Sequence, residues 1–269
     1  TNVGAMIALQ NLQVTNNELS EVQSRINTGM KVGSAKDNGA IWAIAQGQRA
    51  EIGALNAVTD SLQRGQSAVD VSLAAGESVS DLLLQLKEKA LAATDTSLTT
   101  SARSALNEDF TSIRDQIATV VDNAEFNGVN LLDGSITGGF AALANVSGST
   151  ITVASQDMSL SGSVVTLGAT DQINTASAAT ASLALVTTSI DNVSASLAKL
   201  GTGSKSLATH LTFVGKLQDT LEAGVGNLVD ADLAKESARL QALQTKQQLG
   251  VQALSIANSS SSILLGLFR

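Results

Sequence analysis

The sequence predicts a mainly α-helical protein, an elongated antiparallel coiled-coil or helical bundle with a small β-hairpin region. Its 269 residues include no proline, although an average usage of about 5% would supply roughly a dozen. Because proline is the main breaker of helices, long uninterrupted helices are expected. Only 2% of the residues are aromatic, a composition that argues against the compact core of a typical enzyme.

Four segments space their apolar residues by heptads, the pattern of a helix that buries one seam against a neighbour. The second segment, 62–93, includes Gly76, whose missing side chain lets a partner helix approach closely. The third segment is 106–124. The fourth, 190–228, is the longest, and we expect it to form one long helix. The first segment is marked by Ala5, Leu12, Leu19 and Ile26.

A region of different texture separates the third and fourth segments. The turn pairs Asn127-Gly128 and Asp133-Gly134 follow the third segment and end its helix. From about 136 to 168 the chain is rich in Gly, Ser, Thr and Val, and the residues from Thr150 onward alternate as a strand does. We therefore expect a small β-hairpin, followed by helices that return and bring the two ends of the chain side by side.

Charge and composition exclude several classes of function. The formal net charge of −8 would repel a nucleic acid. The chain has no cysteine, which removes disulfides, thiol nucleophiles and thiolate metal ligands. No apolar run approaches the roughly 18 residues of a membrane span. The most apolar stretch, 263–268, lies at the end of the sequence, where it needs a partner to cover it.

Each candidate chemical site has a simpler structural explanation. His210 is the single histidine, and no nucleophile is paired with it in the sequence. The GTGSK stretch at 201–205 lacks the spacing of a phosphate-binding loop and lies inside the fourth heptad segment. Asp230 and Asp232 precede a helical segment, where acidic residues stabilise a helix N-terminus. We therefore expect no enzyme activity, no cofactor and no bound metal.

Motifs at both ends of the chain carry a resemblance to a known family. They are TNVGAMIALQNL at 1–12, RINTGMKVGSAKDNGAIWAIAQGQR at 25–49, FNGVNLLDG at 126–134, and VDADLAKESARLQALQTKQQLGVQALSIANSSSSILLGLFR at 229–269. The first three resemble the N-terminal region of bacterial flagellin, and the last resembles its C-terminal region. The KDNGAIWA variant and the short middle are similar to the compact flagellins of alphaproteobacteria. Since the family normally starts a few residues before the Thr1-Asn2 pair, we expect further residues ahead of Thr1.

The resemblance implies how the chain is divided and how it assembles into a helical filament. Flagellins pair their terminal helices as a coiled coil that lines an inner tube, and their central helices build an outer tube. The corresponding parts of this chain are 1–30 and 230–269 for the inner-tube terminal coiled coil, 31–44 for a spoke linker, 45–134 and 180–229 for the outer-tube helical bundle, and 135–179 for a short variable region with the β-hairpin.

The function implied by the resemblance is that of the structural subunit of the bacterial flagellar filament, which serves swimming motility. Such a subunit is exported unfolded, without a cleavable signal peptide, and polymerises outside the cell by coiled-coil packing of its termini. The expected assembly interface consists of Leu9, Leu12, Leu19, Ile26, Trp42, Leu240, Leu243, Leu254, Ile263, Leu264, Leu267 and Phe268.

The partners implied by the resemblance are further copies of the chain, sister flagellins, a flagellar export chaperone, the type III export apparatus, the filament cap and the hook-associated junction proteins. No nucleic acid and no membrane is expected among them. Two alternatives remain: a hook-filament junction protein, which shares the terminal helices, and a membrane-interacting translocator with amphipathic termini. The SAKDNGA motif at 34–40 favours flagellin over the junction protein, and sparse Lys and Arg on the terminal helices disfavour the translocator.

Overall fold

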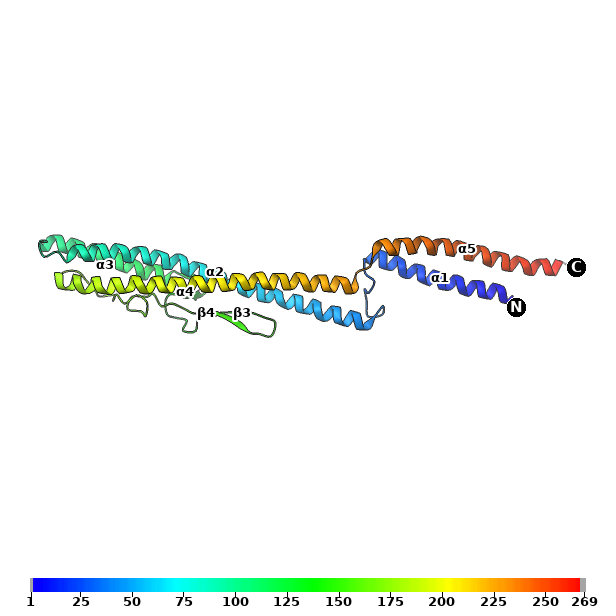
Figure 1. Cartoon of the computed structure of the whole chain (residues 1–269), viewed down its shortest axis with the longest axis horizontal. Coiled ribbons are helices and arrows are strands. Elements are labelled where there is room, and N and C mark those ends of the chain that lie inside the picture. Colours follow the sequence, from blue (N-terminus) through cyan, green and yellow to red (C-terminus); the bar gives the residue numbers. More distant parts are fainter. Residues whose placement is uncertain (1, 267–269) are drawn as a thin grey trace. The chain divides into compact units, whose positions relative to one another are not determined.

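Long helices make up most of the molecule, as the heptad segments predict. The computed structural model describes residues 2–266, with side-chain positions for residues 2–259. Short antiparallel hairpins, β1–β2 and β3–β4, lie between the third and fourth helices (Figure 1). The elements in chain order are α1 (Val3–Thr28), α2 (Gly39–Ala93), α3 (Thr100–Asp122), β1 (Glu125–Phe126), β2 (Val129–Asn130), β3 (Phe140–Leu143), β4 (Thr150–Val153), α4 (Ala176–Val229) and α5 (Leu233–Gly266).

The chain forms two compact units. Unit 1 consists of residues 1–52 and 219–269, and unit 2 consists of residues 53–218. The helices α2 and α4 contribute residues to both units. Unit 1 therefore joins the two ends of the sequence, and unit 2 holds its middle.

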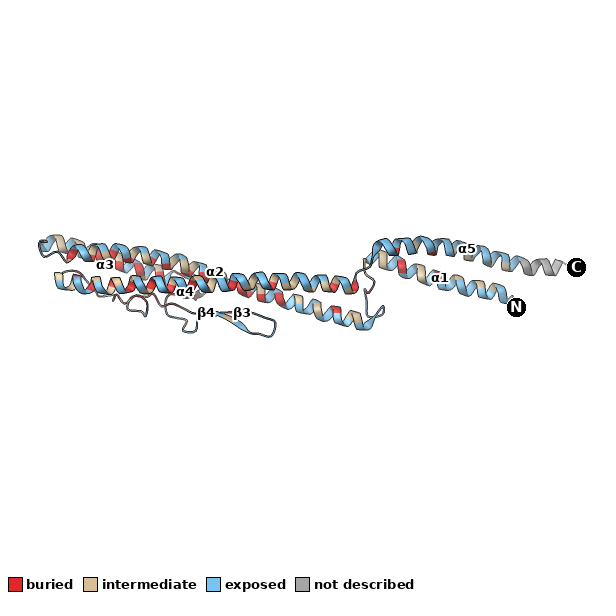
Figure 2. Cartoon of the chain, viewed as in Figure 1, coloured by how far each residue is buried: buried red, intermediate tan, exposed pale blue. Residues whose placement is uncertain are grey.

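Unit 2 is a bundle of α3 with most of α2 and α4, and the buried residues of these helices contribute to its core (Figure 2). Its buried residues on α2 recur every three or four positions, as in Leu62, Val69, Leu83 and Ala90. Such spacing places them on a single face of the helix. The heptad prediction for 62–93 is confirmed. The largest side chains of this core with almost no exposed surface are Leu62, Leu83, Leu86, Phe110, Ile117, Leu131, Leu132, Met158, Leu167, Ile173, Leu200 and Leu207.

Glycine sets how closely α2 and α4 approach each other. A Cβ atom added to Gly76 would lie 2.7 Å from Cδ2 of Leu197, so Leu197 would have to shift to make room for it. One added to Gly65 would lie 2.8 Å from Cε1 of Phe140 on β3, and at an ordinary contact distance of 3.4 Å from Cδ1 of Leu207 on α4. The residue pairs also show that α2 and α4 are antiparallel, because a rising number on one helix meets a falling number on the other.

Both helices are longer than the heptads predict. The seam on α2 was expected from residue 62 and the seam on α4 from residue 190, but the helices start at Gly39 and Ala176. The added part of α4 continues the same burial pattern with small residues, Ala179 and Ser182. Small residues give a weak apolar signal in sequence, although they pack well where two helices are close.

Both hairpins form where the sequence has turn residues. Asn127 and Gly128 have φ angles of 50° and 80°, the left-handed pair of a two-residue hairpin turn, and they join β1 to β2. This short hairpin was predicted only as a turn. The expected hairpin within 136–168 is β3–β4, in which Phe140 pairs with Val153 and Leu143 pairs with Thr150.

The β3–β4 hairpin is attached to the helices by polar contacts. The backbone N–H of Leu143 donates to Oγ of Ser61 on α2 at 3.0 Å. On α4, Nε2 of His210 lies 2.6 Å from the carbonyl oxygen of Ala144. His210 therefore links α4 to the end of the β3–β4 hairpin.

A pair of glycines in this hairpin region tests its packing. Gly139 and Gly148 both have positive φ, 76° and 85°, so alanine at either position is strained by roughly 1–2 kcal/mol. At Gly139 an added Cβ would also lie 2.1 Å from the carbonyl oxygen of Val153, whereas at Gly148 it meets open space. We expect Gly139→Ala to lower the free energy of unfolding by more than about 2 kcal/mol and Gly148→Ala by about 1 kcal/mol. Denaturant unfolding of the two variants makes this comparison, and equal losses would contradict the close contact.

Candidate functional site

In unit 1 the helices α1 and α5 run side by side in opposite directions (Figure 1). Nδ2 of Asn2 donates to the carbonyl oxygen of Ala257 at 2.7 Å. Nε2 of Gln247 donates to Oδ1 of Asn16 at 2.7 Å, so a higher number on α1 meets a lower number on α5. The first and last helices of the chain thus form an antiparallel pair.

The seam between α1 and α5 follows strict heptad spacing. On α5, seven residues between Leu233 and Ser259 are buried or half-buried, and all the others in that range are exposed. These seven recur at alternating steps of four and three, as in a coiled coil. The seam residues are Ala5, Ala8, Leu12, Thr15, Leu19, Val22 and Ile26 on α1, and Glu236, Leu240, Leu243, Gln247, Gly250, Leu254 and Ala257 on α5.

This seam is less apolar than the core of unit 2. Small or polar residues, among them Thr15, Gln247 and Gly250, occupy positions where a stable coiled coil would place Leu, Ile or Val. A Cβ on Gly250 would lie 3.2 Å from Cδ1 of Leu12, so the helices approach closely at that point. The pair therefore gains little free energy from apolar burial along its length.

A charged residue lies within the seam at the end near the linkers. Glu236 is buried, with 8% of its surface exposed, and its Oε1 is 3.4 Å from Nη1 of Arg25. Its Oε2 is buried without a hydrogen-bond partner among the described residues. A buried polar residue at one seam position fixes the register of a helix pair at a cost in stability. The Arg25–Glu236 pair therefore sets which turns of α1 and α5 face each other.

Large apolar side chains cover the faces of α1 and α5 that point away from the seam. On α1 the exposed fractions are 59% for Met6 and 55% for Ile7. On α5 they are 60% for Leu249 and 69% for Ile256. Both groups lie at the end of the pair where Asn2 meets Ala257. The other exposed members are Val3, Leu9, Val14 and Val251, and Val3, Met6, Ile7 and Leu9 line a shallow groove of about 470 Å³ with Gln10 and Gln13.

Two linkers at the opposite end of the pair are held together by backbone hydrogen bonds. The N–H groups of Lys31 and Val32 both donate to the carbonyl oxygen of Val229, at 2.7 and 3.2 Å. The N–H of Ala231 donates to the carbonyl oxygen of Gly29 at 2.8 Å. Gly29 has a φ of 70°, a conformation that favours glycine after a helix C-terminus. The segments that leave α1 and enter α5 are thus paired as a short antiparallel bridge.

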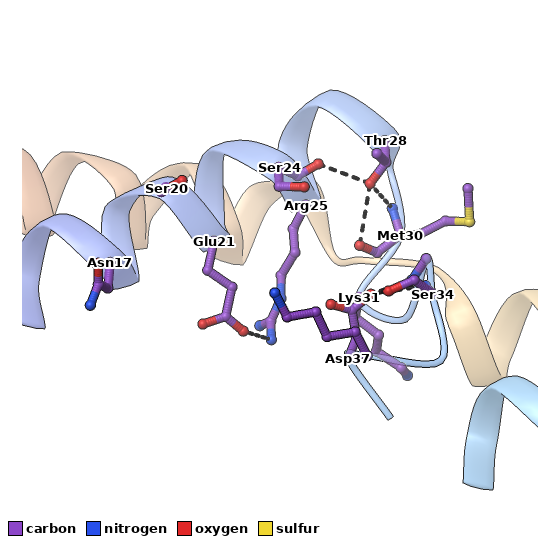
Figure 3. Close-up of a pocket in the computed structure, with 12 residues that line it drawn as sticks. Asn17, Ser20, Glu21, Ser24, Arg25, Thr28, Met30, Lys31, Ser34 and Asp37 are labelled. Atoms are coloured by element: carbon purple, nitrogen blue, oxygen red, sulfur yellow. Dashed lines mark hydrogen bonds and ion pairs between the residues drawn. The ribbon is translucent and has the colours of Figure 1, made fainter. Parts of the chain in front are cut away.

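A polar pocket of about 660 Å³ lies beside these linkers (Figure 3). In its wall the carboxylate of Asp37 accepts hydrogen bonds from the hydroxyl and the N–H of Ser34 and from the N–H of Gly33. These bonds, the Ser34 hydroxyl first, lower the pKa of Asp37 below its usual value. The ionised carboxylate therefore stabilises the turn at 33–37, and this stabilisation is lost when acid protonates it.

Trp42 lies in a small apolar cluster of unit 1. The cluster is built on buried Val32, Ala45, Val225 and Val229, and the half-buried Trp42 packs against it. The other half-buried members are Ile41, Ile52 and Leu228. The cluster holds Val32, in the linker between α1 and α2, and the start of α2 against the end of α4.

The structure separates the residues that the sequence placed in one assembly interface. Leu9 is exposed, and Trp42 lies in the apolar cluster. Ile263 and Leu264 are within α5 but beyond the described side chains, and Leu267 and Phe268 lie outside the described residues. The outward-facing Met6, Ile7, Val14, Leu249, Val251 and Ile256 were missed, although their apolar character off the heptad line is visible in the sequence. The six interface residues in the α1–α5 seam are Leu12, Leu19, Ile26, Leu240, Leu243 and Leu254.

The described residues of this site are suited to packing against other side chains. Among residues 2–266, no group of three or more His, Asp or Glu side chains is placed to hold a metal ion. In the same part of the chain, no helix combines the length and apolar character that crossing a membrane requires. The arrangement offers two apolar helix faces and a linker bridge.

Comparison with known proteins gives matches at both ends of the chain. Residues 1–137 match the bacterial flagellin N-terminal helical region, and residues 183–268 match the bacterial flagellin C-terminal helical region. The chain is similar to flagellin FljM and flagellin FljK of Caulobacter vibrioides, each 61% identical over 269 residues, which cover 100% of this chain and 97% of the relative. It is also 38% identical to a flagellin of Brucella melitensis biotype 1, over 100% of this chain and 98% of the relative.

Two solved structures share the fold. The crystal structure of Bacillus cereus flagellin has a TM-score of 0.51 at 22% identity and covers 57% of this chain and 88% of that chain. A putative flagellar hook-associated protein from Vibrio parahaemolyticus has a TM-score of 0.60 at 15% identity and covers 72% of this chain and 100% of that chain. At these identities the likeness establishes the fold alone.

Replacing Trp42 tests the apolar cluster. A fully buried Trp changed to Ala costs about 3–5 kcal/mol, and since Trp42 is half-buried we expect Trp42→Ala to cost about 2 kcal/mol. Ile44, on the same helix but 54% exposed, is the control, and Ile44→Ala should cost no more than about 0.5 kcal/mol. Thermal unfolding of the two variants measures the difference. Equal unfolding temperatures would show that Trp42 contributes no packing.

Proposed function

This chain belongs to the bacterial flagellin family, the structural and non-enzymatic subunits of the extracellular flagellar filament, and on that premise we propose where copies of it join. The contact is made by the outward-facing apolar side chains of α1 and α5. The single observation that supports this choice is the exposure of large apolar side chains on both helices of the pair, including Ile7 and Ile256 at 55% and 69%.

The free energy of burying these exposed apolar side chains favours binding to a partner. Burying one large aliphatic side chain is worth roughly 1.5–3 kcal/mol. Met6, Ile7, Leu249 and Ile256 are each 55–69% exposed, so together they withhold roughly 4–7 kcal/mol from a chain that leaves this surface in water. Apolar groups collected at one end of a helix pair are typical of an interaction surface.

A second copy of the chain fits this surface better than a membrane does. The net charge of −8 repels anionic lipid, and the membrane-interacting translocator is disfavoured for that reason. A surface on one copy that meets a different surface on the next copy does not close on itself and grows into a filament. The α1 face and the α5 face are two such different surfaces.

The last residues of the chain extend the proposed surface in sequence. Leu249, Ile256 and Ile263 are seven residues apart, so a continuous helix places them on one face. We include Ile263, Leu264, Leu267 and Phe268 in the contact between copies for this reason. The proposed inner-tube part remains 1–30 with 230–269, joined through the 31–44 spoke to the outer-tube bundle of 45–134 and 180–229, with 135–179 as the variable region.

We propose further, specific partners on the basis of the same family membership. We include sister flagellins, a flagellar export chaperone, the type III export apparatus, the filament cap and the hook-associated junction proteins. A junction protein itself is the second candidate function, and the Vibrio parahaemolyticus structure supports it through the fold alone. The relatives that match at 61% over the whole chain are flagellins, so the filament subunit is favoured.

A paired substitution tests the proposed contact. We expect Ile7→Ser together with Ile256→Ser to raise the critical concentration for polymerisation at least about 100-fold, because two lost aliphatic contacts are worth about 3 kcal/mol or more. The control is Leu233→Ser, which removes a somewhat less exposed leucine, 50% exposed, at the other end of α5. Sedimentation of filaments measures both. Polymerisation of the double variant at the normal concentration would rule out this contact.

Hydrogen exchange tests whether the helix pair orders during assembly. Ordering a residue costs about 1–2 kcal/mol, and the seam with Thr15, Gln247 and Gly250 offers little apolar burial in return. We expect fast amide exchange in α1 and α5 of the monomer and strong protection of the same amides in the filament. Amides of the unit 2 core on α2 serve as the control and should be protected in both states. Protected α1 amides in the monomer would show that the pair folds before assembly.

A further inference from the structure

The three methionines of the chain differ widely in exposure. Met158 is fully buried in the core of unit 2, where a Cβ atom on Gly76 would lie 3.5 Å from its Sδ atom. Met30, in the linker that follows α1, is half-buried. Met6, on α1, is 59% exposed. A reagent in solution therefore reaches the thioether of Met6 more easily than the other two.

The surroundings of Met6 combine apolar and amide side chains. Met6 lines the shallow groove on α1 together with Ile7, and Gln10 and Gln13 line the same groove. Gln10 follows Met6 by four residues and Gln13 follows it by seven, so both lie on the same face of the helix as Met6. The two glutamines are exposed, and their amide N–H groups can donate hydrogen bonds. A polar group formed on the Met6 sulfur would thus have donors beside it in its own chain.

Oxidation is the chemistry to which such a side chain is open. The chain has no cysteine, so no thiol competes for a mild oxidant. One added oxygen turns the flexible apolar side chain of methionine into a polar sulfoxide. Burying a polar group that lacks hydrogen bonds costs free energy. A sulfoxide at Met6 would therefore favour water and the neighbouring glutamines over an apolar contact.

We propose that Met6 is an oxidation site that controls assembly, because its thioether permits the contact between copies and its sulfoxide opposes that contact. The oxidant is a peroxide, with hydrogen peroxide as the simplest case. The sulfur lone pair attacks one peroxide oxygen and the O–O bond breaks. The attacked oxygen stays on the sulfur and passes its proton to the other oxygen, which leaves as water. Sulfur is oxidised by two electrons and the peroxide is reduced.

This inference rests on the proposed function, since it takes the outward face of α1 to be covered by the next copy. Met6 is in water in the free chain, and under the proposed contact it is buried in the filament. It should therefore be oxidised much more slowly once the chain has assembled. Methionine sulfoxide reductases, one for each epimer, convert the sulfoxide back to the thioether, so the control is reversible.

Peroxide treatment of the free chain tests the oxidation site. Peptide mass spectrometry measures the sulfoxide at each methionine, and sedimentation of filaments measures the critical concentration. We expect sulfoxide mainly at Met6 and little at the buried Met158, with a rise of about tenfold in the critical concentration. Treatment with both reductases should return the critical concentration to its starting value. Filaments treated with the same peroxide should contain much less sulfoxide at Met6.

Three variants separate Met6 from the rest of the chain. Met6→Leu keeps the volume and the apolar character of the side chain, so it should polymerise normally both before and after peroxide. Met6→Gln places a polar amide there and should raise the critical concentration without any oxidant. Met30→Leu is the matched control, because it removes a thioether at the other end of α1 and should leave the response to peroxide unchanged.

The outcomes distinguish this inference from the proposed function. Suppose that chain fully oxidised at Met6 polymerises at the normal concentration while Ile7→Ser with Ile256→Ser does not. The control by Met6 is then overturned, and the proposed contact stands. Normal polymerisation of both the oxidised chain and that double variant would overturn both. Loss of assembly by peroxide-treated Met6→Leu, or equal sulfoxide formation at Met6 in filaments and in free chain, would also overturn the inference.

Discussion

The burial of one narrow stripe along each long helix is the interaction on which the rest of the structure depends. In α2 the stripe that includes Leu62, Leu83 and Ala90 is fully buried. In α5 just seven of the residues between Leu233 and Ser259 are buried or half-buried. A helix without proline can keep such a stripe continuous over many turns. Once the stripe is covered, every other face of the helix is left for solvent or for another molecule.

The two units use the same stripe in different ways. In unit 2 the stripe is apolar, and Gly76 lets α2 and α4 come close. In unit 1 the stripe contains Thr15, Glu236 and Gln247. These polar residues fix the register of the α1–α5 pair but add little to its stability. The apolar core therefore stabilises mainly the middle of the chain, and the α1–α5 pair has less apolar burial to stabilise it.

Fold and function rest on different observations in this protein. A putative hook-associated protein shares the fold at 15% identity, so the fold does not by itself choose between a filament and a junction. The identity of 61% to Caulobacter flagellins over the whole chain makes that choice. In the proposed function the outward faces of α1 and α5 make the contact between copies, because their apolar side chains are largely exposed within the described part of the chain.

The sequence by itself determined the helices, the turn at Asn127-Gly128 and the family, because heptad spacing, turn residues and motifs are local patterns that need no partner to be recognised. The sequence did not determine which surface covers the apolar stripe of each helix. Periodicity places Leu12 and Leu243 on one face of their helices, but only the tertiary structure shows that these faces cover each other and leave Ile7 and Ile256 outside. The place of Trp42 against Val225 and Val229 was decided in the same way. A side chain is buried by the residues that the fold places beside it. For Leu12 and Trp42 these residues are about 180 or more positions away in the sequence, so a local pattern cannot identify them.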